Sequence, residues 1–283
     1  MKDIAMQMYS FGFDKPMTLA EQFKEAARMG YTGVELIRNY MDVPAETLKQ
    51  QADEAGIAIV SAHVPMDYII NDLPYLAKLG MKMIICPGTP FATKEEALIV
   101  AAELNCIGKE AAKYGIRVGY HNHTSEFFED GGKPILDYVI ENTDPETVVF
   151  EIDCGWASAA DIDPVAYINR HAGRIAGIHV KENGAVVGPG TPRSRFDKTP
   201  APVYPKDENG KPILPPEVIA ARKERDKLNV ATGTGIVDWK AVKAAADAQR
   251  SDVLYIVERE ANYGDLSRLE CLEADCKWIQ ENL

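Results

Sequence analysis

Histidine is rare in this chain, and four of its five histidines stand where predicted strands end. His121 and His123 lie two residues apart in the stretch GYHNHTSEF, residues 119–127, and His63 and His179 close two other β-rich runs. Side chains two residues apart on a strand project from the same face, so His121 and His123 are expected on one side of the sheet. Imidazole is both a proton-transfer group near neutral pH and a common metal ligand. The pattern therefore indicates acid–base chemistry, metal binding or both.

Carboxylates occupy corresponding positions at two further strand ends. Glu151 and Asp153 are two residues apart in FEIDCGW, and Glu258 and Glu260 are two residues apart in YIVERE. Imidazole and carboxylate groups that converge from neighbouring strands describe a divalent-metal site, and mixed nitrogen and oxygen ligands suit Mn²⁺, Zn²⁺, Co²⁺ or Fe²⁺ better than an all-oxygen Mg²⁺ or Ca²⁺ site. Each residue alone has an alternative role as a hydrogen-bonded packing residue. Their occurrence at several equivalent strand ends favours the metal site.

Strands and helices alternate along the chain. Four helical stretches end in glycine just before a β-rich run, at Gly30, Gly56, Gly80 and Gly115, and glycine past a helix supplies the left-handed residue that ends it. The eight predicted strands cover residues 4–11, 33–37, 57–63, 82–88, 116–122, 147–155, 174–182 and 253–260. This alternation predicts one α/β domain over residues 1–283, a single (β/α)₈ TIM barrel. The alternative is an open doubly wound sheet, but the first predicted strand is followed by no GxGxxG fingerprint.

A proline-rich segment interrupts the alternation after the seventh predicted strand. Eight of the chain's 17 prolines lie between Lys181 and Gly235, and we place an inserted loop or lid at residues 183–235, at the C-terminal face of the barrel. A loop of this length is usually functional or disordered, and this one leaves the end of the barrel where active sites lie. The helical-looking stretch at 216–229 indicates a partly ordered lid or an interface arm; a solvated insertion is the alternative.

Charge and composition limit the partners of the chain. The formal net charge is −12, which argues against a general nucleic-acid or anionic-membrane binder, because such proteins need a basic face. The start MKDIAMQMYSF has no basic region before an apolar run, and no apolar run approaches the length of a membrane span. Five cysteines without a CxxC pair indicate a reduced, cytoplasmic protein.

The motifs together resemble the sugar phosphate isomerase/epimerase superfamily with the xylose isomerase-like barrel, in the group that bears YHNHxxEF. The resemblance covers nearly all of the chain except residues 187–230 and rests on VSAHVP, GYHNHTSEF, FEIDCGWASAADIDP, GRIAGIHVKE, GTGIVDW and YIVERE. It implies one catalytic divalent metal ion per chain, with Mn²⁺ expected first and Zn²⁺, Co²⁺ or Mg²⁺ as alternatives. The metal ligands that it implies are His121, Asp153, His179 and Glu258.

Position 121 departs from the epimerase pattern. In the epimerases two glutamates from facing strands exchange protons with the two faces of one carbon, and His121 stands where one of them is expected. Glu258 is then the one equivalent carboxylate, and His123 or Lys181 could take the second proton-transfer role. The first expectation is a sugar isomerase or epimerase that works through a metal-stabilised enediolate. Because of His121, we give nearly equal weight to a lyase or dehydratase that eliminates a β-substituent from a keto-sugar, inosose or keto-glycoside.

Several further residues are candidates for the site. His63 closes a strand and could bind the substrate, and Trp156 could cover the apolar face of a sugar or pack at the rim. Glu126 could orient the neighbouring imidazole or cap a helix, Glu35 could bond a substrate hydroxyl or line the core, and Glu151 could support a ligand histidine. We expect a small-molecule carbohydrate substrate and a homo-oligomer. A nuclease of this fold would need more metal ligands and a basic DNA face, and a non-catalytic sugar-binding barrel would not need the metal ligands.

Overall fold

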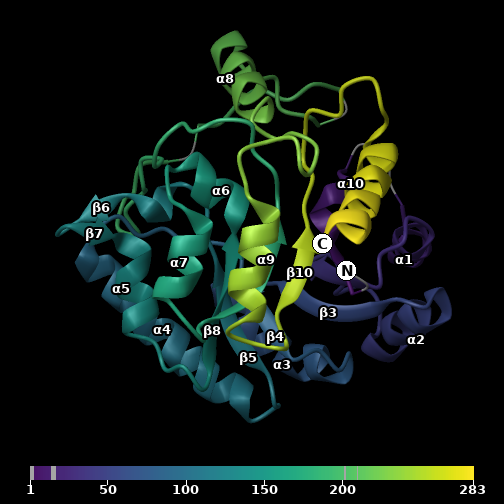
Figure 1. The fold of residues 1–283 in the computed structure, drawn as a ribbon, viewed down its shortest axis with the longest axis horizontal. Helices are drawn as coiled ribbons and strands as arrows, with labels where there is room; N and C mark the ends of the chain where they lie inside the picture. Colours follow the sequence, from purple (N-terminus) through teal and green to yellow (C-terminus); the bar gives the residue numbers. More distant parts are fainter. Residues whose placement is uncertain (1–2, 14–16, 201, 209) are drawn as a thin grey trace.

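Eight parallel strands form a closed barrel in the computed structural model of the chain, which describes residues 3–13, 17–200, 202–208 and 210–283 (Figure 1). The barrel strands are β1 (Ala5–Gln7), β2 (Gly33–Ile37), β3 (Ala58–His63), β4 (Met83–Cys86), β5 (Arg117–His121), β8 (Val148–Asp153), β9 (Ile175–Val180) and β10 (Leu254–Val257). Their order around the barrel is β1-β10-β9-β8-β5-β4-β3-β2, and β1 also pairs with β2. The predicted (β/α)₈ TIM barrel is confirmed.

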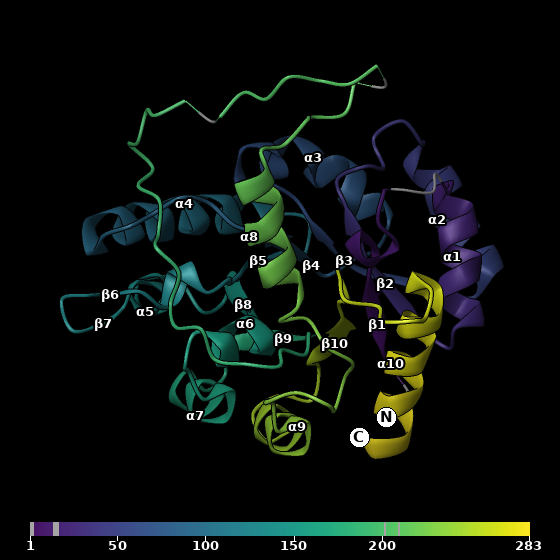
Figure 2. The same ribbon diagram turned by 90° about the horizontal axis from the view of Figure 1, so that it is seen from above.

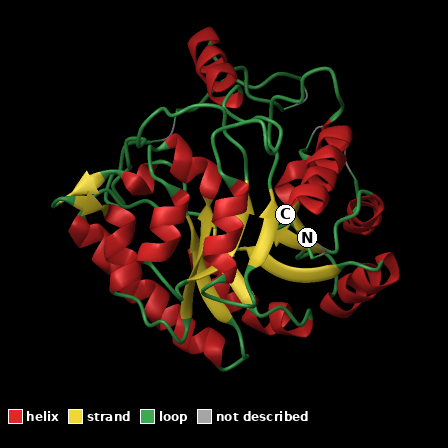
Figure 3. Cartoon of the chain, in the orientation of Figure 1, coloured by secondary structure: helices red, strands yellow, loops and turns green. Residues whose placement is uncertain are grey.

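Helices surround the barrel and connect its strands (Figure 3). They are α1 (Leu19–Arg28), α2 (Ala45–Ala55), α3 (Met66–Lys78), α4 (Lys94–Ala112), α5 (Ile135–Glu141), α6 (Cys154–Ala159), α7 (Pro164–Arg170), α8 (Pro216–Asp226), α9 (Trp239–Asp247) and α10 (Arg268–Asn282). The smaller elements are the 3₁₀ helices η1 (Met8–Phe11) and η2 (Ser125–Phe127) and the hairpin of β6 (Glu129–Asp130) with β7 (Lys133–Pro134). Among the described residues, no helix is both long and apolar enough to cross a membrane.

The predicted helix ends at glycine are confirmed. Gly30, Gly56, Gly80 and Gly115 all have positive φ, between 70° and 97°. A residue with a side chain would be strained in this conformation, so glycine is what allows each helix to stop and the chain to turn into the next strand. The first strand is shorter than predicted. It ends at Gln7, whose side chain accepts a hydrogen bond from the backbone N–H of Tyr9 and starts η1.

The alternation of side chains along β8 shows how the barrel positions polar groups. Val149 belongs to a small apolar cluster with Met83, Ile85 and Ala176 of β4 and β9. Glu151 and Asp153 follow Val149 at steps of two residues and are fully buried. Because side chains two apart share a face, this face of β8 changes from apolar to carboxylate toward the C-terminal end of the strand.

The connection between β9 and α9 extends beyond the C-terminal end of the barrel and includes α8 (Figures 1 and 2). None of the residues of α8, all of which the structure describes, is buried. The first part of the connection is attached to α4, because Ser194 bonds Glu96 and Arg195 forms a 2.6 Å ion pair with Glu103. The last part returns to the barrel at Asn229, whose Oδ1 accepts hydrogen bonds from the backbone N–H groups of residues 260 and 261. Both ends of the connection are therefore anchored, while α8 between them has no buried residue.

Candidate metal and substrate site

Two imidazoles and two carboxylates meet at the C-terminal end of the barrel. His121 ends β5, Asp153 ends β8, His179 lies near the end of β9, and Glu258 directly follows β10. All four side chains are buried, and one ligand atom from each lies within 4.8 Å of the others. His179 Nδ1 is 3.5 Å from Glu258 Oε2 and 4.0 Å from Asp153 Oδ2, and His121 Nε2 is 3.9 Å from the same Asp153 oxygen. We call these four residues the ligand set.

The ligand set fits a divalent cation. Asp153 Oδ2 and His179 Nδ1 are buried and have no hydrogen-bond partner among the described residues. Buried polar atoms without partners are uncommon and cost free energy, so two of them facing each other need an explanation. Ligand atoms about 2.0–2.1 Å from a tetrahedral metal lie about 3.4 Å from one another, close to the spacing seen here. A metal bound by nitrogen and oxygen would satisfy both atoms.

Protons and a metal ion would compete for the ligand set. Burial, followed by the charge of His179, lowers the pKa of His121 to about 3, so this ring is neutral and able to act as a ligand. Burial raises the pKa of Asp153 to about 7, against the charges of Lys181 and His179. Burial alone would raise the pKa of Glu258 as well, but the charges of Lys181 and His179 hold it well below its usual range. Burial lowers the pKa of His179, but Glu151 and Glu258 raise it well above its usual value. A cation would therefore displace protons from both His179 and Asp153 and would offset the negative charge of the two carboxylates.

Asn122 and the start of α6 hold Asp153 in place. Asp153 Oδ1 accepts a 2.8 Å hydrogen bond from the backbone N–H of Trp156 and so caps α6, which leaves Oδ2 to face the ligand set. Asn122 Oδ1 accepts from the backbone N–H of Asp153 at 3.0 Å, and Asn122 Nδ2 donates to its carbonyl oxygen at 3.3 Å. The residue between the two histidines of β5 thus ties the ends of β5 and β8 together.

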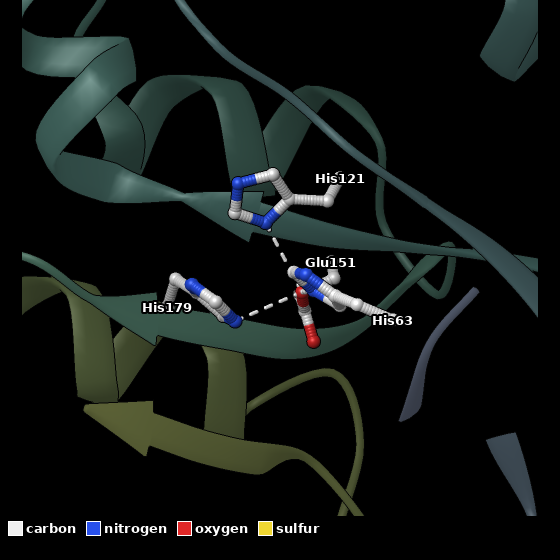
Figure 4. Close-up of side chains that lie close together, drawn as sticks. All are labelled: His63, His121, Glu151 and His179. Carbon is white, nitrogen blue, oxygen red and sulfur yellow. Dashed lines mark hydrogen bonds and ion pairs between the residues drawn. The ribbon is translucent and has the colours of Figure 1, made fainter. Parts of the chain in front are cut away.

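A second polar group, on the side of the ligand set away from the cavity, joins Glu151 and His63 to the two ligand histidines (Figure 4). Glu151 Oε1 is 3.1 Å from His121 Nδ1 and 3.0 Å from His179 Nε2, and His63 Nε2 lies 3.0 Å from the same oxygen. Glu35 also belongs to this group: its carboxylate is 2.9 Å from His179 Nε2 and is fully buried. The proposed substrate-hydroxyl role of Glu35 does not fit this position, which matches the alternative of a polar residue inside the core.

A cavity of about 430 Å³ opens above the ligand set. This volume is in the range of roughly 300–1,000 Å³ that is typical of small-molecule sites. Five residues with predicted site roles line it: His63, His121, His123, Trp156 and Glu258. Tyr9, Arg38 and Arg225 also line it, although no motif in the sequence points to them.

His123 and Glu126 form a pair at this cavity. The His123 ring centroid is 5.1 Å from that of His121, and the side chain is 47% exposed, so it lies outside the buried ligand set. Glu126 accepts a 3.1 Å hydrogen bond from the His123 backbone N–H, and its other oxygen is 3.7 Å from His123 Nδ1. Desolvation lowers the pKa of His123, but the hydrogen bond and charge of Glu126 outweigh it and raise the pKa. His123 is therefore the more readily protonated of the two imidazoles of the YHNH motif.

Lys181 is a buried counter-ion to two carboxylates. Its Nζ is 3.1 Å from Glu258 Oε2, forms an ion pair with Glu260, and lies 4.6 Å from the ring centroid of Trp156. Burial lowers the pKa of Lys181, but Glu258 and Glu260 raise it above its usual value. A lysine held in the charged form is a poor proton acceptor, so this geometry favours electrostatic support of Glu258 over the role of base.

A family model described as xylose isomerase-like TIM barrel matches residues 23–282. The chain belongs to the xylose isomerase-like TIM barrel family. The inosose dehydratase of Lactiplantibacillus plantarum is 31% identical over 114 residues, which are 40% of this chain and 37% of that protein. The inosose dehydratase of Salmonella typhimurium is 23% identical over 295 residues, with 95% of this chain and 90% of that protein covered. The chain spans 37% of the L. plantarum protein and 64% of the Clostridium beijerinckii inosose dehydratase, less than two thirds of either.

Two solved structures share the fold of this xylose isomerase-like barrel. A sugar phosphate isomerase/epimerase from Parabacteroides distasonis superposes with a TM-score of 0.74 at 22% identity, covering 99% of this chain and 98% of that one. The IOLI protein, whose structure contains a zinc atom, superposes with a TM-score of 0.71 at 12% identity, covering 99% and 97%. The predicted resemblance to the xylose isomerase-like barrel family is confirmed, and membership of the YHNHxxEF-bearing group remains a prediction.

Proposed function

We propose that this family member is a divalent-metal-dependent lyase of the dehydratase type, which acts on a keto-sugar, inosose or keto-glycoside. The relatives support a sugar-derivative isomerase, epimerase or dehydratase, and the proposal selects elimination from these. The observation that carries this choice is the state of His121. Nδ1 of its imidazole bonds Glu151 and Nε2 faces Asp153 in the ligand set, so neither nitrogen is left to take a proton from a substrate, as the second base of a two-base epimerase must.

The remaining acid–base groups suit elimination. Glu258 is held ionised and lines the cavity, so it can take the proton from the carbon next to the substrate carbonyl. The C–H electrons first move onto the carbonyl oxygen to give an enolate, and this proton transfer is reversible. When the carbonyl bond re-forms, a carbon–carbon double bond forms to the adjacent carbon, and the bond from that carbon to its oxygen substituent breaks. Protonated His123 gives its proton to that departing oxygen, which leaves as water or an alcohol. Trp156 lies between Lys181 and His123 and could cover the ring of the substrate.

His121, Asp153, His179 and Glu258 would hold the metal. A divalent ion there would polarise the carbonyl oxygen and stabilise the negative charge that develops on it when the neighbouring carbon loses its proton. Mn²⁺, Zn²⁺ and Co²⁺ all accept this mixture of nitrogen and oxygen ligands. The donor set supports a transition-metal ion in preference to Mg²⁺.

The reaction can be tested by NMR in D₂O with metal-loaded protein and a panel of inososes, keto-sugars and keto-glycosides. We expect deuterium to enter beside the carbonyl and water or an alcohol to be released with formation of an unsaturated ketone. An epimerised or isomerised product that keeps all its substituents would instead establish the isomerase expected first from the sequence.

Glu258→Gln is expected to abolish deuterium exchange while the protein still binds metal with reduced affinity. The amide keeps the shape of the side chain but cannot accept the proton, and loss of a general base costs roughly 10²–10⁴-fold in rate. Glu260→Gln is the matched control, because Glu260 also pairs with Lys181 but lies outside the ligand set. A much smaller rate loss is expected there; equal losses in both variants would mean that the Lys181 ion pair, not Glu258 as base, accounts for the effect.

The inserted segment is proposed to cover the substrate. Arg225 of α8 lines the cavity although its side chain is 67% exposed, and its ion-pair distance to the neighbouring Asp226 is a long 4.0 Å. A guanidinium in this position is free to bond substrate oxygen atoms. The homo-oligomer and the cytoplasmic location remain predictions.

Arg225→Ala should raise KM by about 10-fold and leave metal content and Tm unchanged. This change corresponds to about 1.4 kcal/mol, the size of a hydrogen bond to a charged group. Arg222→Ala is the control, because Arg222 is on the same helix but does not line the cavity. A change of oligomeric state without a change of KM would show that α8 is an interface arm and not a lid.

A further inference from the structure

The carboxylate of Glu151 contacts both imidazoles of the ligand set through one oxygen atom (Figure 4). Oε1 is 3.1 Å from Nδ1 of His121 and 3.0 Å from Nε2 of His179, and Glu151 is fully buried. These distances are those of N–H···O hydrogen bonds. The nitrogen left over on each ring, Nε2 of His121 and Nδ1 of His179, is the one that faces Asp153.

These contacts fix which nitrogen of each ring carries the proton. A neutral imidazole has one N–H and one lone pair, so a ring that donates to Glu151 must present its lone pair on the other nitrogen. In the metal-binding state, after His179 has lost its second proton, the two rings use opposite tautomers, with the remaining proton on Nδ1 of His121 and on Nε2 of His179. We propose that Glu151 is the positioning residue that selects the metal-binding tautomer of His121 and, together with Glu35, whose carboxylate is 2.9 Å from the same Nε2, that of His179. This inference rests on the metal site proposed above.

Gly177 provides the space that Glu151 occupies. Gly177 of β9 is the register partner of Glu151 of β8, at a point where the register between the strands shifts. A Cβ atom at position 177 would lie 3.0 Å from Cγ and 3.2 Å from Oε2 of Glu151, so the carboxylate would have to move by a few tenths of an ångström. Glycine at this position therefore lets the carboxylate lie under both rings.

A second cation is the competing explanation for the second polar group. His63, His121, Glu151 and His179 also offer atoms within 4.8 Å of one another. However, Glu151 Oε1 is already within 3.0–3.1 Å of a nitrogen of each ring, whereas the atoms of the ligand set are 3.5–4.0 Å apart. The atoms of the second polar group are at hydrogen-bonding distance from one another, whereas the atoms of the ligand set have the wider separation expected between the ligands of one metal ion. We therefore expect one metal ion per chain.

The test compares metal binding by the wild type, Glu151→Gln and Gly177→Ala. The measurements are bound Zn²⁺ per chain, Zn²⁺ affinity by chelator competition, and the d–d absorption spectrum of the Co²⁺-loaded protein. Glu151→Gln should lower the affinity by about 10- to 100-fold, as for other groups that orient metal ligands, and change the Co²⁺ spectrum. Gly177→Ala should do the same to a smaller degree, with every ligand still present.

Gly108→Ala is the control for general strain. Its added Cβ would lie 2.9 Å from Oγ1 of Thr147, and Thr147 does not belong to the ligand set. It should lower Tm without altering the Zn²⁺ affinity or the Co²⁺ spectrum. Unchanged affinity and spectrum in both Glu151→Gln and Gly177→Ala would overturn the inference, as would two ions per wild-type chain of which Glu151→Gln loses one. A wild type that binds no metal would instead refute the metal site of the proposed function. If Glu151→Gln does not fold, Gly177→Ala decides.

Discussion

Asp153→Asn is expected to lower metal affinity by more than about 10²-fold and to remove measurable turnover. Loss of a group that merely orients a ligand already costs about 10- to 100-fold, and Asp153 is proposed to bind the metal itself through Oδ2. Asparagine keeps an oxygen that can accept the hydrogen bond from the Trp156 backbone, so the cap of α6 is preserved. The measurement is elemental analysis of unchelated protein, followed by titration with Mn²⁺, Co²⁺ and Zn²⁺.

The matched control is Asp163→Asn. Asp163 caps α7 with the same type of hydrogen bond, to the backbone N–H groups of Val165 and Ala166, but it is outside the ligand set. It should change Tm slightly and leave metal content unaltered. A wild type without metal and without activation by any of the three ions would refute the site, and full metal content in Asp153→Asn would remove Asp153 from the ligand set.

The fold could be predicted because local signals in the sequence agreed with one another. Four glycines marked where helices stop, and their positive φ values show that the conformation itself required glycine. Strand ends were less accurate: β10 stops at Val257, so Glu258 enters the site from a loop, and β5 stops at His121, so His123 does too. Side chains in a loop do not alternate between two faces as they do in a strand. The two-residue spacing of these side chains therefore does not determine where they lie.

The candidate site could be predicted only as far as its strand ends. Depth within a barrel depends on strand tilt and register, which the sequence does not give. Glu35 illustrates this limit, because its oxygens accept hydrogen bonds from Gln7 and Ser61 inside the barrel and it does not line the cavity described here. Arg225 was missed for another reason: it comes from the inserted segment, whose path over the barrel is set by distant anchors such as the ion pair of Arg195 with Glu103.

The position of His123 connects the sequence pattern with the reaction. The two histidines of the YHNH motif look equivalent in the sequence, but the structure buries His121 in the ligand set and leaves His123 half-exposed at the cavity beside Glu126. One imidazole is thereby neutral and the other is favoured in its protonated form. A general acid needs to be protonated and accessible, and of the two only His123 meets both conditions.

His123→Ala is expected to keep its full metal content and to lose turnover by roughly 10²-fold or more, the usual scale for a missing general acid. Deuterium exchange beside the carbonyl should survive, because Glu258 is intact, while release of the leaving group fails.

Glu126→Gln should retain part of the activity and shift its pH profile. Glu126 raises the pKa of His123, so removing the charge of the carboxylate lowers that pKa. Activity that needs protonated His123 should then begin to decline at a lower pH in this variant than in the wild type. Metal analysis, NMR exchange and pH–rate profiles of both variants provide the measurements. If His123→Ala loses its metal while His121→Ala keeps it, the roles of the two imidazoles are reversed.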